Sequence, residues 1–168
     1  CITVMHNFDS RTFYTKWIQD MLGAQNPETG YVPNGAPWQP GCGGGVAWGS
    51  AINIMPWEFY LHYGDIDMLK NNYEGMKGYI KYMLTWTNEQ GNMFSQAPNP
   101  SNPMKWLNLG DWAPAPELPP DEMVHTFYLW RCADLTAKTA KALGKNNEAD
   151  EYNKLAERTK VAFQQKFF

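Results

Sequence analysis

The sequence predicts an all-α fold built from helical hairpins. Apolar residues recur at helical spacing through most of the chain, and no segment shows credible strand character. Two connections between these helical segments are only long enough for a tight turn, which makes the helices that they join antiparallel neighbours. Two other connections, residues 23–47 and 88–120, are long loops rich in Gly, Pro and Asn.

The first expected helix covers residues 10–22. Asp9 or Ser10 can act as its N-cap, and Gly23 is expected to end it. One stripe carries apolar residues at i, i+1, i+4, i+5, i+8 and i+9: Phe13, Tyr14, Trp17, Ile18, Met21 and Leu22. That spacing is typical of an amphipathic helix packed on a core.

The second and third expected helices, residues 49–63 and 66–86, form a hairpin. Gly64 is expected to end the second helix in the left-handed conformation, and Asp65 can cap the third. Pro56 removes one backbone donor, which predicts a kink or a late start. One face of the third helix carries Leu69, Tyr73, Met76, Ile80, Met83 and Leu84.

The fourth and fifth expected helices form a second hairpin. The fourth covers residues 121–143, Gly144 stops it, and Asn146 or Asn147 starts the fifth. The fourth carries Val124, Phe127, Tyr128, Leu135 and Leu143 on one stripe, and the fifth carries Tyr152, Leu155, Ala156, Phe163 and Phe167.

Alternating helix directions place both tight turns at one end of the stack and both long loops at the other. Loops of this length are uncommon in compact domains and are usually functional or disordered. Their tryptophans argue against disorder, which goes with few aromatic residues: Trp38, Trp48, Trp106 and Trp112. The loop end is therefore expected to form a binding surface.

The composition excludes several classes of protein. A net charge of −3 and the lack of a Lys/Arg cluster argue against nucleic-acid binding, and no apolar run is long enough to span a membrane. The three cysteines show no zinc spacing, the three histidines no metal spacing, and the phosphate-binding glycine motifs are missing. No metal or cofactor is therefore expected, and the cysteines do not indicate a compartment.

Asp111 and Trp112, together with Trp48, are the candidate substrate-binding residues. An indole can stack on the C–H face of a sugar ring while a neighbouring carboxylate accepts hydrogen bonds from its hydroxyls. The alternative is structural: Trp112 fills a gap in the core, Asp111 caps a turn and Trp48 anchors a helix end. Acidic residues at the loop end are Glu28, Asp111, Glu117, Asp121 and Glu122. No acid–base pair can be assigned among them, because the last two also suit a helix start.

Several short runs resemble family 78 of the glycoside hydrolases, the bacterial α-L-rhamnosidases. The matching runs, in order, are residues 7–9 (NFD), 30–33 (GYVP), 47–51 (AWGSA), 56–57 (PW), 63–65 (YGD), 110–112 (GDW) and 142–144 (ALG). The resemblance covers nearly the whole chain. It implies an (α/α)6 toroid of six helical hairpins, with the active site at the long-loop end.

The resemblance also implies roles for particular residues. Trp48 and Trp112 would line a rhamnose subsite, and the family inverts configuration without a metal or organic cofactor. Ser50 departs from a common variant that has Asp at this position. The family's general acid would lie in an Arg-Glu…Gly-Trp motif before Cys1 and its general base beyond Phe168.

Residues 1–168 are therefore expected to be a partial catalytic domain, truncated at both ends. The expected partners are a rhamnose-containing saccharide or glycoside and the remainder of the same polypeptide. The resemblance suggests a bacterial protein, periplasmic or secreted at full length.

Three alternatives stay open at this stage. The chain could belong to another six-hairpin glycosidase, because nothing in the residues alone fixes rhamnose. It could be a non-catalytic helical carbohydrate-binding module. A terpene-cyclase-like helical barrel would require an Asp-rich motif, of which residues 65–67 (DID) are only a fragment.

Overall fold

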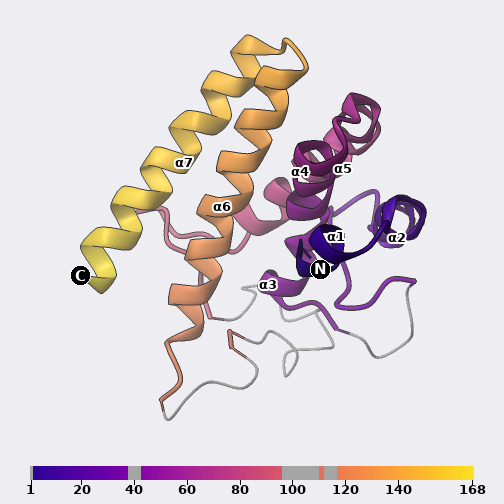
Figure 1. The fold of residues 1–168 in the computed structure, drawn as a ribbon. Helices are drawn as coiled ribbons and strands as arrows, with labels where there is room; N and C mark the ends of the chain where they lie inside the picture. Colours follow the sequence, from indigo (N-terminus) through magenta and orange to yellow (C-terminus); the bar gives the residue numbers. More distant parts are fainter. Residues whose placement is uncertain (1, 38–42, 96–109, 112–116) are drawn as a thin grey trace.

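The computed structural model describes residues 2–37, 43–95, 110–111 and 117–168, and this part of the chain is helical without any strand (Figure 1). Its helices are α1 (Ile2–Asn7), α2 (Arg11–Ala24), α3 (Val46–Gly49), α4 (Ala51–Tyr63), α5 (Ile66–Leu84), α6 (Asp121–Ala142) and α7 (Asn146–Phe167). An antiparallel bridge pairs Thr87 with Met93. No described helix combines the length and the apolar character needed to cross a membrane. The predicted all-α class is confirmed.

The two predicted hairpins are α4–α5 and α6–α7. Gly64 and Gly144 end the first helix of each with positive φ angles of 70° and 74°. Glycine adopts this backbone conformation without the steric cost that a Cβ imposes. Asp65 caps α5 as predicted, because its carboxylate accepts the backbone N–H groups of Asp67 and Met68 at 3.1 and 3.3 Å.

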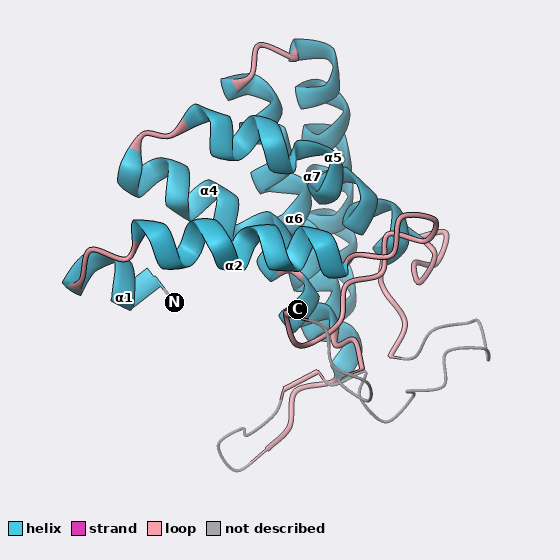
Figure 2. Ribbon diagram, turned by 90° about the vertical axis from the view of Figure 1, so that its right-hand side faces the viewer, coloured by secondary structure: helices cyan, strands magenta, loops and turns pink. Residues whose placement is uncertain are grey.

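Because the helices of each hairpin run in opposite directions, the tight turns and the long loops lie at opposite ends of the helical stack. In Figure 1 both tight turns lie in the upper part of the molecule, while the described parts of both long loops reach into its lower half. Figure 2 shows the same separation after a quarter turn. The N-termini of α4 and α6 therefore both face the loop end.

Among the described residues, three apolar clusters hold the helices together. The largest joins α3, α4, α5 and α6 with both loops through Val32, Val46, Ile52, Tyr79, Ile80, Met83, Trp86, Met93, Leu129 and Cys132. A second joins α1 and α2 to α4, and a third joins α7 to α5 and α6. Helices α4 and α6 pack on each other and on several neighbours. Both still leave apolar side chains in solvent, since Leu61 is 60% and Phe127 is 42% exposed.

The first predicted helix agrees with α2 at its start and differs from it at its end. The prediction that Gly23 ends it was wrong, because α2 continues to Ala24 and its C-cap is Gln25. The Gln25 amide donates hydrogen bonds to the carbonyls of Gly30 and Gly75, which fixes the point where the chain leaves the helix. Ser10 is the N-cap by position, but its hydroxyl pairs with the Tyr63 hydroxyl.

The second predicted helix, residues 49–63, corresponds to α4, and the short helix α3 before it was not predicted. The chain turns at Ser50, which separates α3 from α4. Pro56 lies buried inside α4, and α4 begins five residues before it, so the proline does not delay the start of the helix. The short helix α1 was not predicted. It is anchored by Met5, which packs in the second cluster.

Candidate functional site at the loop end

Trp48 lies on α3, the single helical turn that leads into α4 at the loop end. Its side chain is half-buried, while the three glycines before this helix, Gly43 to Gly45, are buried. Asn34 clamps this stretch: its N–H donates to the Gly43 carbonyl at 2.7 Å, and its side-chain oxygen accepts the Gly45 N–H. The part of the first loop around Asn34 is thus hydrogen-bonded to the glycines directly before α3 and Trp48.

A polar cluster lies beneath α3. The Val46 carbonyl accepts hydrogen bonds from the Ser50 N–H at 3.0 Å, the Ser50 hydroxyl at 2.6 Å and the Tyr79 hydroxyl at 3.0 Å. Burial raises the pKa of Tyr79, and the Ser50 hydroxyl partly offsets this by hydrogen bonding. Burial also raises the pKa of Cys132 to about 12, again partly offset by a hydrogen bond with Ser50. Both groups are therefore neutral near pH 7. We refer to Val46, Ser50, Tyr79 and Cys132 as the Val46 cluster.

Asp111 lies next to the start of α6. Its neighbour Gly110 is buried, and a Cβ built there would lie 2.4 Å from the Asp121 Oδ1 atom. The loop backbone therefore rests directly on the first residue of α6, and the exposed Asp111 follows at the helix N-terminus. Trp112, as well as Trp38 and Trp106, lies outside the described residues.

The structure brings Trp48 and Asp111 to the same end of the helices. Helix α3 packs against α6, and Cys132 meets Ser50 at that contact. Asp121, beside Gly110, lies 11 residues before Cys132, or about 16 Å along the helix at about 1.5 Å per residue. The segment that carries Asp111 thus lies nearer the N-terminus of α6 than Ser50 does. Within the described ranges, no hydrogen bond or ring contact joins the two residues.

The acidic residues at the loop end do not form an assignable acid–base pair. Glu122 is ion-paired with Lys166 of α7, and Asp121 is packed against Gly110. Glu117 is exposed in the segment before α6. Among the described residues, no group of three or more His, Cys, Asp and Glu side chains could hold a metal ion.

The sequence interpretation missed a set of contacts that fixes the second loop to α6. The Thr126 hydroxyl accepts the Met93 N–H at 3.0 Å, and His125 Nδ1 lies 2.9 Å from the Phe94 carbonyl. The His125 ring meets Trp86 edge to face, with 6.2 Å between ring centroids. The sequence feature that could have indicated these contacts is the pair His125 and Thr126 beside the apolar stripe of the fourth predicted helix. Buried polar side chains need hydrogen-bond partners, so this pair predicts contacts with another segment.

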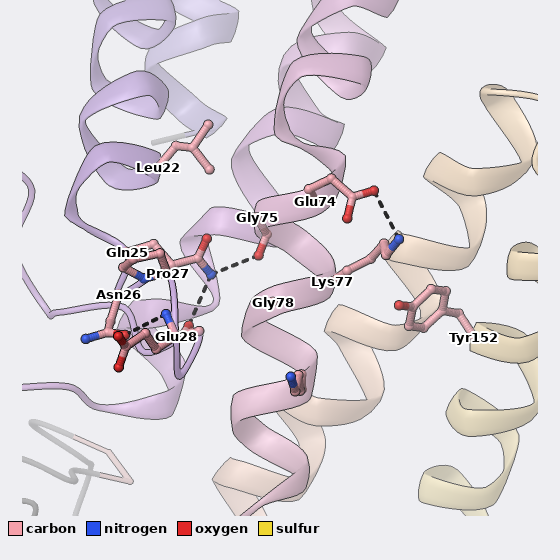
Figure 3. Close-up of a pocket in the computed structure, with 12 residues that line it drawn as sticks. Leu22, Gln25, Asn26, Pro27, Glu28, Glu74, Gly75, Lys77, Gly78 and Tyr152 are labelled. Carbon is pink, nitrogen blue, oxygen red and sulfur yellow. Dashed lines mark hydrogen bonds and ion pairs between the residues drawn. The ribbon is translucent and has the colours of Figure 1, made fainter.

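A groove of about 560 Å³ lies elsewhere, over the middle of α5 (Figure 3). It is lined by Leu22, Gln25, Asn26, Pro27, Glu28, Gly30, Glu74, Gly75, Lys77, Gly78, Lys81 and Tyr152. Gln25 crosses its floor to the Gly75 carbonyl at 2.9 Å, and Lys77 pairs with Glu74 at 3.0 Å. Because neither Trp48 nor Asp111 lines it, the groove is separate from the candidate sugar site.

The family of the chain follows from its match to a family model over residues 1–168. The matching model describes the bacterial α-L-rhamnosidase six-hairpin glycosidase domain. This chain belongs to that family. The resemblance noted in the sequence is therefore confirmed, and the described helices are hairpins from an (α/α)6 toroid.

Curated relatives agree with this membership. An α-L-rhamnosidase of Streptomyces avermitilis is 30% identical over 163 residues, which is 96% of this chain and 14% of the relative. One of Alteromonas sp. is 30% identical over 177 residues, covering 98% of this chain and 18% of the relative. The chain thus spans less than a fifth of the length of these relatives.

Solved structures share the fold. The α-L-rhamnosidase of Streptomyces avermitilis in complex with L-rhamnose superposes with a TM-score of 0.81 at 28% identity, covering 95% of this chain and 14% of that one. An α-L-rhamnosidase from Dictyoglomus thermophilum superposes with a TM-score of 0.80 at 30% identity, covering 96% and 17%. The roles of Trp48, Asp111 and Trp112 stay predictions.

Proposed function

We propose that the polypeptide containing this chain is an α-L-rhamnosidase that removes terminal α-L-rhamnose from glycans or glycosides. The observation that carries this proposal is the family match over all 168 residues. The position of Trp48 supports it, because a half-buried indole at the loop end leaves part of a flat apolar surface for a ligand.

In this proposal Trp48, Asp111 and Trp112 bind the sugar. The indoles would pack against the C–H face of rhamnose, and Asp111 would accept hydrogen bonds from ring hydroxyls. Asp111 suits this role because it is exposed and directly follows Gly110, which is tightly packed on α6. Its carboxylate would then be presented from a fixed backbone.

The proposed chemistry is inverting hydrolysis by two carboxyl groups. A carboxylic acid protonates the leaving-group oxygen while a carboxylate about 6.5–9.5 Å away deprotonates the attacking water. The C–O bond of the leaving group breaks as water forms the new bond on the opposite face of the sugar. We assign both carboxyl groups to parts of the polypeptide outside residues 1–168. The engagement of Glu122 with Lys166 and of Asp121 with Gly110 supports this assignment.

Kinetics of the complete natural polypeptide on an aryl α-L-rhamnoside test the proposal. Trp48→Ala should raise KM about tenfold, and Asp111→Asn should also weaken binding. Trp17→Ala is the matched control, because this half-buried indole packs in the cluster around α2. It should lower thermal stability and leave KM unchanged. An unchanged KM in both Trp48→Ala and Asp111→Asn would show that neither residue binds the sugar.

The stereochemistry and substrate tests separate the alternatives. Proton NMR during turnover should show β-L-rhamnose first, and release of the α-anomer would exclude inversion. Turnover of a different glycoside in place of the rhamnoside would support another six-hairpin glycosidase. Rhamnose binding without turnover would support a binding module. The isolated 168 residues should not hydrolyse the rhamnoside. Turnover by them would make Asp111, Glu117 and Asp121 the candidates for the catalytic carboxyl groups.

A further inference from the structure

The helix that carries Trp48 is too short to hold its own conformation. Helix α3 has four residues, and forming a first helical turn is unfavourable because several dihedral angles are fixed for a single hydrogen bond. Its position therefore depends on contacts with the rest of the fold. Helix α3 packs on α6 and α4, and several of its hydrogen bonds meet at its first carbonyl, that of Val46, two residues before Trp48.

Helix α5 provides the contact to this carbonyl from outside the α3–α4 segment. The Tyr79 hydroxyl donates to the Val46 oxygen at 3.0 Å, from a side chain that is 1% exposed. The same carbonyl already accepts the N–H and the hydroxyl of Ser50. The Tyr79 bond is thus not required to satisfy the Val46 oxygen, and its effect is to fix α3 against α5.

The opposite end of α3 contacts the same tyrosine. A Cβ built on Gly49 would lie 2.3 Å from the Tyr79 hydroxyl and 2.6 Å from its Cζ atom. The tyrosine therefore touches α3 both before and after Trp48, through a hydrogen bond at Val46 and through close packing at Gly49. Both contacts restrict the rotation of α3 about its axis, and that rotation sets the direction of the Trp48 side chain.

We propose that Tyr79 is a positioning residue for saccharide binding: its hydroxyl fixes α3 so that the Trp48 indole faces the sugar. This inference rests on the proposed sugar-binding role of Trp48. Tyr79 itself is buried beneath α3 and acts through Trp48 rather than by touching the substrate.

The test is Tyr79→Phe in the complete natural polypeptide, assayed with an aryl α-L-rhamnoside. The ring stays and only the hydroxyl is lost, so KM should rise about three- to tenfold while kcat changes less than about twofold. The matched control is Tyr73→Phe on the same helix. Tyr73 is 2% exposed, and its hydroxyl donates to Glu148 of α7 at 3.2 Å, away from α3. Its KM should stay within about twofold of the wild type.

A double-mutant cycle distinguishes positioning from a general loss of stability. If Tyr79 acts through Trp48, Tyr79→Phe should have no further effect on KM in a Trp48→Ala background. Independent, multiplicative effects of the two substitutions would overturn the inference. So would an unchanged KM in Tyr79→Phe, or an equal rise in Tyr73→Phe.

The outcomes also separate this inference from the proposed function. A normal KM in Tyr79→Phe together with a raised KM in Trp48→Ala would reject the positioning role and leave the sugar site intact. A normal KM in Trp48→Ala would reject the role of Trp48 in the proposed function, and the role of Tyr79 with it. Thermal unfolding of each variant shows that the kinetics report on folded protein.

Discussion

Asn53 of α4 and Thr136 of α6 are joined by a buried hydrogen bond of 3.0 Å. The same Asn53 amide nitrogen donates to the Met76 carbonyl of α5 at 3.1 Å, so one side chain ties three helices together. Asn53 and Thr136 are both fully buried. Hydrogen bonds inside the core are directional, whereas apolar packing is not. This contact therefore fixes the register of α4 and α6, whose N-termini both face the loop end.

We expect Asn53→Ala to destabilise the protein by about 2–3 kcal/mol, because it removes buried packing and both hydrogen bonds that the Asn53 amide donates, to the Met76 carbonyl and to the Thr136 hydroxyl. Thr136→Val keeps the shape of the side chain and should cost about 1 kcal/mol. Urea unfolding of both single variants and the double variant should give a coupling energy of about 1 kcal/mol. Additive single effects would show that the hydrogen bond does not stabilise the fold.

The ion pairs of Glu148 predict how stability depends on pH. A hydrogen bond from Lys77 lowers the pKa of Glu148 below its usual value, with further contributions from Lys145 and Tyr73. A carboxyl whose pKa is lowered by folding stabilises the native state above its unfolded pKa, and this stabilisation is lost as pH falls through the folded pKa. Glu148→Gln should therefore lower the melting temperature at pH 7, and the difference from wild type should shrink between about pH 5 and about pH 3.

Glu151→Gln is the control for this pH dependence, since Glu151 is exposed on the same helix and no ion pair involves it among the described residues. Its melting temperature should follow that of the wild type across the same range. Added salt should reduce the effect of Glu148→Gln, because exposed charges are screened. A constant difference between Glu148→Gln and wild type at all pH values would contradict the ion-pair explanation.

The sequence was sufficient to predict the parts of the fold that depend on local chemistry. Gly64 and Asp65 specified the turn between α4 and α5, because one adopts a positive φ angle and the other accepts backbone N–H groups. The start and the end of α6 were also predicted to within one residue, the end from Gly144 and the helix itself from its apolar spacing. Once the turns were known, the opposite placement of turns and loops followed from helix direction alone.

Features that depend on distant residues could not be predicted. The predicted helix began only at Gly49, whereas α3 already begins at Val46 and the chain turns at Ser50. The anchor of α3, Tyr79, lies 33 residues after Val46. The apolar spacing assigns Tyr79 only to a helix and carries no information on its hydroxyl partner. Likewise, Gly23 looked like a helix end, yet the chain leaves α2 at Gln25 because of a bond to Gly75. For the candidate site, the sequence predicted that Trp48 and Asp111 lie at the long-loop end, where the structure has them, and their roles in binding stay predictions.

Cys132 should be unreactive in the folded protein. Its pKa is raised to about 12 by burial, and alkylation requires the thiolate. Iodoacetamide at about pH 8 should leave Cys132 unmodified in the native protein and modify it fully in urea. Peptide mass mapping resolves this cysteine from Cys1 and Cys42, which lie outside the described residues. Complete native labelling at Cys132 would show that the Val46 cluster opens readily to solvent.

Two glycine-to-alanine substitutions should have opposite effects on stability. A Cβ at Gly49 meets the Tyr79 hydroxyl at 2.3 Å, so Gly49→Ala should force α3 away from α5 and cost about 1–3 kcal/mol. Gly23 lies within α2, and a Cβ added there would meet no heavy atom within 4 Å. Gly23→Ala should therefore stabilise the protein by about 0.5 kcal/mol through helix propensity. Thermal unfolding of both variants measures the difference. Equal melting temperatures for the two variants would contradict this prediction, because they would show that α3 can move away from Tyr79 without loss of stability.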